Sequence, residues 1–305
     1  MSRAPIFIGG LDRSGKTLLR LAISSHPNIV MTRRTYMWRQ FYNRFGDLSD
    51  EANFESCLAG MLERKAVHLL KPEPQRIRME FWQSDEHTYA RLFSILHEHF
   101  AERMGKTRWG EQEGSIEHYS KQIFEAYPSA RVIHLIRDPR GRFGDELESL
   151  GSGLGRVGFT TAEWLVSTRL GMENVQKYSG RYMLLQFEHL LVKPEETLRT
   201  ICAFIEEEFS QAMLTLERAI SLGFEDDAGT DRTQVWSDER VNEYLSASDV
   251  VSSQDVAFIE NYAGKLMTSQ GYALTNPPLT LSQYLAYYTA WPVNFIRLKS
   301  KQPME

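Results

Sequence analysis

Residues Gly10 to Thr17 combine glycines, cations and hydroxyls at a spacing suited to holding a phosphate group. They read G-L-D-R-S-G-K-T and match the pattern G-x-x-x-x-G-K-[ST] in full. The glycines let successive backbone N–H groups turn toward an anion, and a helix after the loop would point its positive end at the same spot. Lys16 adds a mobile ammonium and Arg13 a planar guanidinium that can contact two oxygens at once. This segment is predicted to bind phosphate.

Apolar runs and helical patterns alternate around and after this loop. Ile6–Ile8 is expected to be a strand before the loop, and Thr17–Ser25 a helix after it that ends at His26-Pro27. The apolar runs RVIHLI and RYMLLQF are expected to be buried strands at Arg131–Ile136 and Arg181–Phe187. Helical patterns lie between the strands, at Thr88–Arg103, Ser115–Tyr127, Thr161–Tyr178 and Pro194–Glu207. The alternation predicts an α/β fold whose parallel sheet is flanked by helices on both faces.

Composition excludes several classes of protein. The 305 residues carry a net charge of −5, so binding to nucleic acid through bulk positive charge is not expected. No run of 18 apolar residues occurs, so no integral membrane segment is expected, and a cytoplasmic location is predicted. Cys57 and Cys202 are far apart and have no metal-ligand spacing, which predicts two buried thiols and no structural zinc.

Five segments together resemble the sulfotransferases that use 3′-phosphoadenosine-5′-phosphosulfate (PAPS), in particular their bacterial and tyrosylprotein branch. The first is G-G-x-x-R-S-G-x-T-L-L-R, followed by S-H-P, and the second is RVIHLIRDPRGR at Arg131–Arg142. Three weaker matches are RWGEQ at Arg108–Gln112, FEHLLVKPEE at Phe187–Glu196, and Asp255–Tyr272, which ends in GY. The resemblance implies a fold related to the nucleotide kinases, PAPS as the donor and 3′-phosphoadenosine-5′-phosphate (PAP) as the product.

The resemblance also assigns residues to the donor. Arg13 matches the family's contact to the transferring sulfonate, and Arg137 matches its arginine on the 3′-phosphate. The loop around the 5′-phosphate corresponds to Ser14, Gly15, Lys16, Thr17 and Leu18. Residues 1–275 are expected to form the sulfotransferase-like P-loop domain, with 276–305 as an aromatic-rich C-terminal extension packed on it. The expected activity moves a sulfuryl group to a hydroxyl or amine of a small-molecule acceptor.

The chemistry requires cations and a base. Negative charge grows on the departing phosphate oxygen, and Arg13 and Lys16 are expected to stabilise it without a metal ion. Glu111 is the leading candidate for the general base, on a short turn near the carboxyl edge of the sheet; the alternative is a local cap or ion pair. Related enzymes carry a glutamate where this chain has 33–35, Arg-Arg-Thr. His134 is expected to be a hydrogen-bonded core residue.

Some positions depart from the family pattern. The family has a serine on the 3′-phosphate where this chain has Asp145, and a carboxylate there repels phosphate. Ser149 is a candidate to replace it, and Arg140 or Arg142 to shield the charge; a solvated Asp145 is the favoured interpretation. The usual tyrosine of the FEHL segment is Phe187, and 112–114 lack the usual lysine.

Two other functions stay open. A P-loop kinase using ATP or GTP with Mg²⁺ would suit Lys16-Thr17, with Asp138 as the metal ligand. A non-catalytic nucleotide-binding homologue would explain Asp145 and Phe187. The acceptor pocket is expected within 35–106, and a homo-oligomer is compatible with the sequence. The aromatic segment Thr280–Lys299 is expected to pack on the core; the alternatives are a seat on a membrane surface or a cover over the acceptor.

Overall fold

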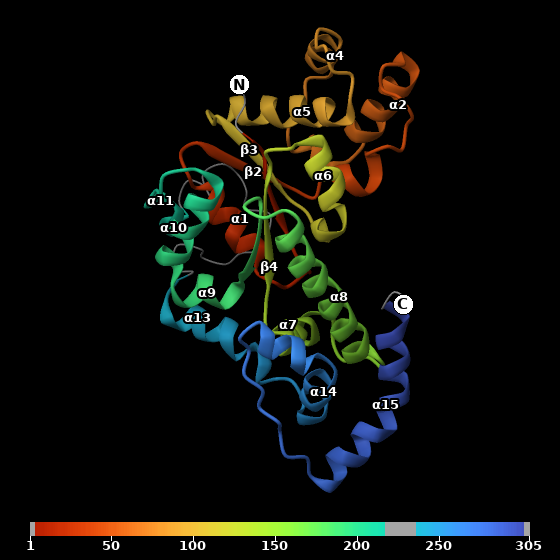
Figure 1. Cartoon of the computed structure of the whole chain (residues 1–305), viewed down its shortest axis with the longest axis vertical. Coiled ribbons are helices and arrows are strands. Elements are labelled where there is room, and N and C mark those ends of the chain that lie inside the picture. Colours follow the sequence, from red (N-terminus) through yellow and green to blue (C-terminus); the bar gives the residue numbers. More distant parts are fainter. Residues whose placement is uncertain (1–3, 217–235, 302–305) are drawn as a thin grey trace.

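The computed structural model describes residues 4–216 and 236–301, and its centre is a parallel sheet (Figure 1). Five strands pair in the order β2-β3-β1-β4-β5. Every pair is parallel, with Ile6 of β1 opposite Gly110 of β3 on one side and Arg131 of β4 on the other. The strands are β1 Ile6–Gly9, β2 Ile29–Arg33, β3 Arg108–Gln112, β4 Arg131–Ile136 and β5 Tyr182–Gln186.

Helices follow the strands and cover both faces of the sheet, which confirms the α/β fold class. The helices before β4 are α1 Lys16–Ser24, α2 Glu51–Leu62, α3 Lys65–His68, α4 Pro74–Trp82, α5 Tyr89–Arg103 and α6 Ser120–Ala126, with a π-helical turn at Met37–Phe41 and a 3-10 turn at Ile116–Tyr119. The later helices are α7 Pro139–Leu150, α8 Arg156–Lys177, α9 Phe187–Val192, α10 Pro194–Ile205, α11 Ala212–Thr215, α13 Asp238–Leu245, α14 Ser253–Ser269 and α15 Leu281–Lys301, with a 3-10 turn at Ser246–Ser248.

Alternate residues of the strands supply two separate cores. Ile8 and Leu135 belong to the core that α1 and α10 cover, whereas Phe7, Trp109 and Val132 belong to the core under α5 and α6. Side chains of successive strand residues point to opposite faces, so a strand covered on both sides is apolar throughout. That continuous apolar run is what made β1, β4 and β5 predictable.

Two strands differ from the expectation. β3 was expected to be a turn, but RWGEQ is a fully buried strand between β1 and β2. Its arginine, glutamate and glutamine are buried, and each has a hydrogen-bond partner elsewhere in the chain; Arg108, for example, donates to the carbonyl of Ala4 at 2.7 Å. β2 begins two residues after Pro27 and has an apolar run of three residues, as β1 does, but it was not among the expected strands.

The C-terminal segment packs on the body of the protein, as favoured from the sequence. Leu298 of α15 is buried, and the Trp291 indole donates to the hydroxyl of Tyr262 on α14 at 2.7 Å. A Cβ on Gly158 of α8 would lie 1.9 Å from the carbonyl oxygen of Asn294, so α8 and α15 are in backbone contact. The division of the chain at residue 275 stays a prediction. No helix in 4–216 or 236–301 has the length and hydrophobicity to cross a membrane.

Candidate functional site

The phosphate loop joins β1 to α1 at the carboxyl edge of the sheet. Gly10 has φ +110°, and a Cβ there would lie 2.2 Å from the carbonyl oxygen of Leu135 on β4. Gly15, the N-cap of α1, has φ +86°, and its Cβ would lie 2.1 Å from the ring of Phe187. Both glycines are therefore required by backbone conformation and by space.

Lys16 is buried within the loop. Its Nζ donates to the carbonyl oxygen of Gly10 and lies 3.5 Å from Oδ1 of the exposed Asp12. Burial lowers the pKa of Lys16, and the negative charges of Asp12 and Glu117 oppose that shift. The ammonium thus lies inside the turn that is shaped for an anion, where the sequence predicted it.

Of the other loop residues, some stabilise the turn and others are exposed to solvent. The Ser14 hydroxyl donates to the carbonyl oxygen of Leu11 at 2.7 Å and closes the turn. Arg13 has a left-handed backbone with φ +67°, and its side chain is exposed, in reach of a ligand above the loop. Thr17 is half-buried in the first turn of α1, and Leu18 is buried beneath it.

Arg137 is held by several partners. Its guanidinium forms an ion pair with Asp145 on α7, in which Nη1 contacts Oδ2 and Nη2 lies 3.4 Å from Oδ1. It also donates to the carbonyl oxygens of Arg13 at 3.1 Å and Tyr244 at 2.8 Å. It lies over the ring of Phe187, 5.3 Å from the centroid. The predicted 3′-phosphate arginine is therefore next to the phosphate loop.

This pairing corrects the favoured interpretation of Asp145 as a solvated helix residue. Its side chain is only 23% exposed and is the counter-ion of Arg137, and it lies in the middle of α7. The suggested shields point elsewhere, because Arg140 binds Asp138 and Glu260. Ser149 is exposed and donates to a carbonyl oxygen of its own helix at 3.2 Å, outside the Arg137 cluster.

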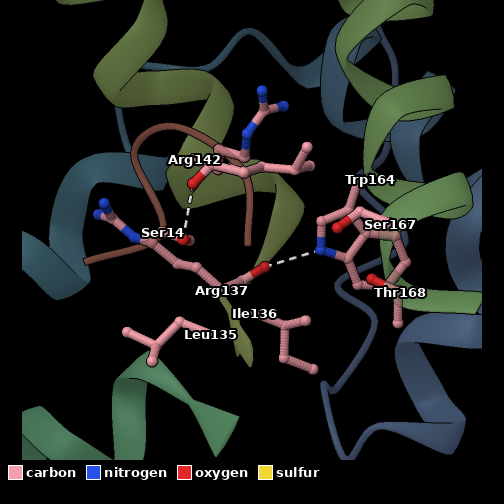
Figure 2. Close-up of a pocket in the computed structure, with 9 residues that line it drawn as sticks. Ser14, Leu135, Ile136, Arg137, Arg142, Trp164, Ser167 and Thr168 are labelled. Atoms are coloured by element: carbon pink, nitrogen blue, oxygen red, sulfur yellow. Dashed lines mark hydrogen bonds between the residues drawn. The ribbon is translucent and has the colours of Figure 1, made fainter. Parts of the chain in front are cut away.

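Arg142 and Trp164 support the loop from behind. Arg142 donates to the carbonyl oxygen of Asp12 at 3.0 Å and to Glu163 of α8 at 3.0 Å. The Trp164 indole donates to the carbonyl oxygen of Arg137 at 2.8 Å (Figure 2). The pocket between them has a volume of about 10 Å³, which is room for one water molecule. It is lined by Leu11, Ser14, Leu135, Ile136, Arg137, Arg142, Trp164, Ser167 and Thr168. It is the packed floor of the loop, too small to be a nucleotide site.

Two buried carboxyl groups lie at the end of β3. Glu111 accepts hydrogen bonds from the backbone N–H of Thr35 at 3.0 Å and from its hydroxyl, which leaves Oε2 without a partner among the described residues. Both carboxyl oxygens of Glu113 are buried and likewise unpartnered there. Burial raises the pKa of Glu111, and burial together with repulsion by Glu111 raises the pKa of Glu113. A Cβ on Gly114, two residues after the end of β3, would lie 4.0 Å from Nζ of Lys16. This end of β3 therefore adjoins the phosphate loop.

A second buried polar chain lies beside Lys16. Glu117 accepts a hydrogen bond from Ser167, whose oxygen lies 3.1 Å from Nε2 of His134; Nδ1 of that ring lies 2.8 Å from the hydroxyl of Tyr182. Burial lowers the pKa of His134, opposed by Glu117. Both ring nitrogens have partners in the core, which confirms the structural interpretation of this histidine.

Two of the weaker family matches, FEHLLVKPEE and the segment that ends at Tyr272, meet beside Asp138, the residue after Arg137. Glu188, from the FEHL segment, accepts from the backbone N–H of Asp138 at 2.8 Å and from the hydroxyl of Tyr272 at 3.1 Å. Asp138 caps α7 and pairs with Arg140 at 2.6 Å. Segments far apart in the sequence are thus joined into one frame around β4.

Sequence reasoning missed Glu113 and Glu117 as parts of the site, and it considered Arg142 only as a shield for Asp145. Glu113 was recoverable, because residues two apart on an extended strand share a face and Glu111 was already a candidate. The roles of Glu117 and Arg142 had no sequence signal, since they depend on α7 and α8 folding back over the loop.

A five-stranded parallel sheet with a phosphate loop after its central strand defines a P-loop protein of the nucleotide-kinase-like class. The model of the sulfotransferase family matches residues 5–211, more than half of the sequence. The chain belongs to the sulfotransferase family, as the resemblance indicated.

Individual relatives are distant. A protein-tyrosine sulfotransferase of Drosophila melanogaster is 22% identical over 226 residues, which are 71% of this chain and 40% of that protein. The chain therefore spans less than half the length of this curated relative. The sulfotransferase domain of the Synechococcus PCC 7002 olefin synthase superposes with a TM-score of 0.58 at 19% identity, covering 89% of this chain and 97% of that domain. This second likeness establishes the fold.

Proposed function

We propose that the protein is an enzyme that transfers a sulfuryl group from PAPS to a hydroxyl or amine of a small-molecule acceptor. The observation that carries the proposal is the buried Lys16, set in a phosphate loop beside a strand end that bears the buried carboxyl group of Glu111. A cation for the departing phosphate and a base for the acceptor thus occupy one edge of the sheet. Family membership supports the reaction class.

The residues fit the 5′-phosphosulfate end of the donor. In the reaction the acceptor oxygen or nitrogen forms a bond to sulfur, and the bond from sulfur to the bridging oxygen breaks with its electron pair on the phosphate. Lys16 and the loop N–H groups, which the loop holds in place before the reaction begins, would stabilise that charge together with the exposed Arg13. Glu111 would accept the acceptor's proton on Oε2, the oxygen that Thr35 does not bind.

The fit to the 3′-phosphate is conditional on the Arg137–Asp145 pair. Arg137 is well placed beside the loop, but it already has a carboxylate partner, so a 3′-phosphate would have to displace Asp145. We expect PAP to stabilise the purified protein against heat more than ADP does, because only PAP carries a 3′-phosphate that Arg137 could bind. Thermal melts with each nucleotide measure this. Equal stabilisation by both would contradict PAPS as the donor.

The kinase alternative is less well supported. Its magnesium ligand would be Asp138, and that carboxylate already caps α7 and pairs with Arg140 at 2.6 Å. Turnover assayed with and without a chelator of divalent cations separates the two reactions: sulfuryl transfer is expected to persist, whereas a kinase would stop. Binding of PAP with no turnover on any acceptor would favour the non-catalytic homologue.

For the acceptor class, we propose a hydroxyl or amine. The Drosophila relative is named for tyrosine in proteins, which makes a phenolic hydroxyl the first acceptor to test beside small amines and alcohols. Arg34, 56% exposed and 3.8 Å from Asp12, would face an acceptor that approaches the loop. The cytoplasmic location and the homo-oligomer stay predictions.

A further inference from the structure

Helix α15 carries an apolar stripe on the side that faces away from the protein. Leu281 is 78% exposed, Leu285 61%, Tyr288 54% and Ile296 65%, and Pro292 is exposed between them. Steps of four, three, four and four residues keep these side chains on one helix face. We call these five residues the outer stripe.

The opposite face of the same helix packs on the body of the protein. Tyr287 and Trp291 pack with the core of α8 and α14, and Asn294 and Leu298 are buried. Figure 1 shows α15 at the periphery of the molecule, bent along its length, with α8 and α14 on one side only. Packing among residues 4–216 and 236–301 therefore accounts for one apolar face, and the outer stripe is a second apolar face that these residues leave exposed.

The charge on this helix is one-sided. Residues 281–301 contain no Asp or Glu, and their charged residues, Arg297, Lys299 and Lys301, all lie in the last turn and a half, in a chain whose net charge is −5. The side chains of Arg297 and Lys299 are exposed and form no ion pair with a described residue. Tyr284 and Tyr288, whose hydroxyls lie 3.2 Å apart, add rings with an apolar body and a polar tip.

We propose that the outer stripe seats α15 in the surface of a membrane that contains anionic lipids. The helix would lie in the plane of the interface, with its apolar face at the boundary of the acyl chains and its cations at the lipid phosphates. Tyrosine is enriched at that depth. Basic residues next to an anionic leaflet add to the attraction. This inference is independent of the proposed function.

A second copy of the chain fits this face less well. If two α15 helices paired in parallel, the cations at their ends would face each other. If they paired antiparallel, each basic end would lie over the apolar first half of the other helix. In both arrangements α15 offers no carboxylate to neutralise them. An anionic lipid surface supplies both the apolar layer and the opposite charge.

Flotation of the full-length protein with vesicles tests the proposal. Vesicles of phosphatidylcholine mixed with phosphatidylglycerol should bind the protein better than phosphatidylcholine alone, and added salt should weaken the binding. The double variant Leu285→Glu/Tyr288→Glu should reduce the partition coefficient by tenfold or more, on the order of the loss of two buried apolar side chains. Arg297→Gln and Lys299→Gln should each reduce it about fivefold.

The matched control is Val192→Glu, which puts the same charge on an apolar residue that is 61% exposed on α9. It should bind vesicles as the natural sequence does. No binding to the mixed vesicles, or binding that the Leu285→Glu/Tyr288→Glu variant retains, would overturn the proposal. So would a dimer in light scattering that this variant makes monomeric, because a second copy would then cover the stripe. Unchanged circular dichroism of the variants rules out unfolding as the cause of any loss.

Discussion

Among single residues, Asp145 has the largest consequence for the donor site. It binds Arg137 in a bidentate ion pair next to the phosphate loop, where the family pattern has a serine. A carboxylate paired with the arginine competes with a phosphate for the same guanidinium. It would therefore weaken the selectivity for a nucleotide with a 3′-phosphate without preventing binding of the 5′ end at Lys16.

Asp145→Ser should increase that selectivity. Removal of the competing carboxylate frees the guanidinium, so the ratio of ADP to PAP dissociation constants should rise roughly tenfold, about the value of one charge-assisted hydrogen bond. Calorimetric titration of both nucleotides measures the ratio. Ser149→Ala is the matched control, since Ser149 is exposed on the same helix and bonds only within it. A ratio that Asp145→Ser leaves unchanged would show that Arg137 does not bind the 3′-phosphate.

The raised pKa of Glu111 predicts how the activity depends on pH. Burial raises its pKa above the usual range of a carboxyl group, and a base acts only when deprotonated, so kcat/KM should fall as the pH falls through that raised pKa. Glu111→Gln should lower kcat by about 10²–10⁴-fold. The pKa of Glu113 is also raised, by burial and by repulsion from Glu111, and Glu113→Gln leaves the Thr35 contacts of Glu111 in place, so kcat/KM of this variant should still fall at low pH. An active Glu111→Gln enzyme with an unchanged profile would transfer the role to another group.

Substitution of Lys16 or Arg13 is expected to lower the rate of transfer, and substitution of Arg13 is expected to do so without loss of stability. Lys16→Ala and Arg13→Ala each remove a cation expected to stabilise the departing phosphate, which should cost about 10²–10³-fold in kcat. Arg13 is exposed, so its variant should melt like the natural protein. PAP release under saturating donor measures kcat, and melting curves measure the fold. Undiminished turnover in either variant would remove that residue from the mechanism.

Among the elements, predictability follows the polarity of each strand. β1, β4 and β5 were predicted because their buried faces are apolar on both sides, and the phosphate loop because its glycines and lysine have fixed spacing. β3 was missed because its buried side chains are polar; their partners, such as Thr35 for Glu111, lie far away in the sequence. The Arg137–Asp145 pair was missed for a related reason. A residue eight positions on reaches the arginine only because α7 starts directly after β4.

At the scale of the whole molecule, the close contact between α8 and α15 holds the C-terminal helix in place. A Cβ on Gly158 would lie 1.9 Å from the carbonyl oxygen and 2.6 Å from the carbonyl carbon of Asn294, which are backbone atoms that cannot turn aside. Gly158→Ala should therefore push α15 away from α8 and lower the free energy of unfolding by about 1–3 kcal/mol, the usual cost of overpacking, even though alanine favours a helix. Denaturant titration measures the change.

Gly153 provides a comparison in which the added Cβ meets no backbone atom. It lies just before α8, and a Cβ there would lie 3.3 Å from the side chain of Arg156, which can move. Gly153→Ala should leave stability within about 0.5 kcal/mol of the natural protein. If Gly158→Ala is equally neutral, α15 is not anchored through this contact. Because the outer stripe needs a helix held at a fixed orientation to present it, Gly158→Ala should also weaken vesicle binding while Gly153→Ala does not.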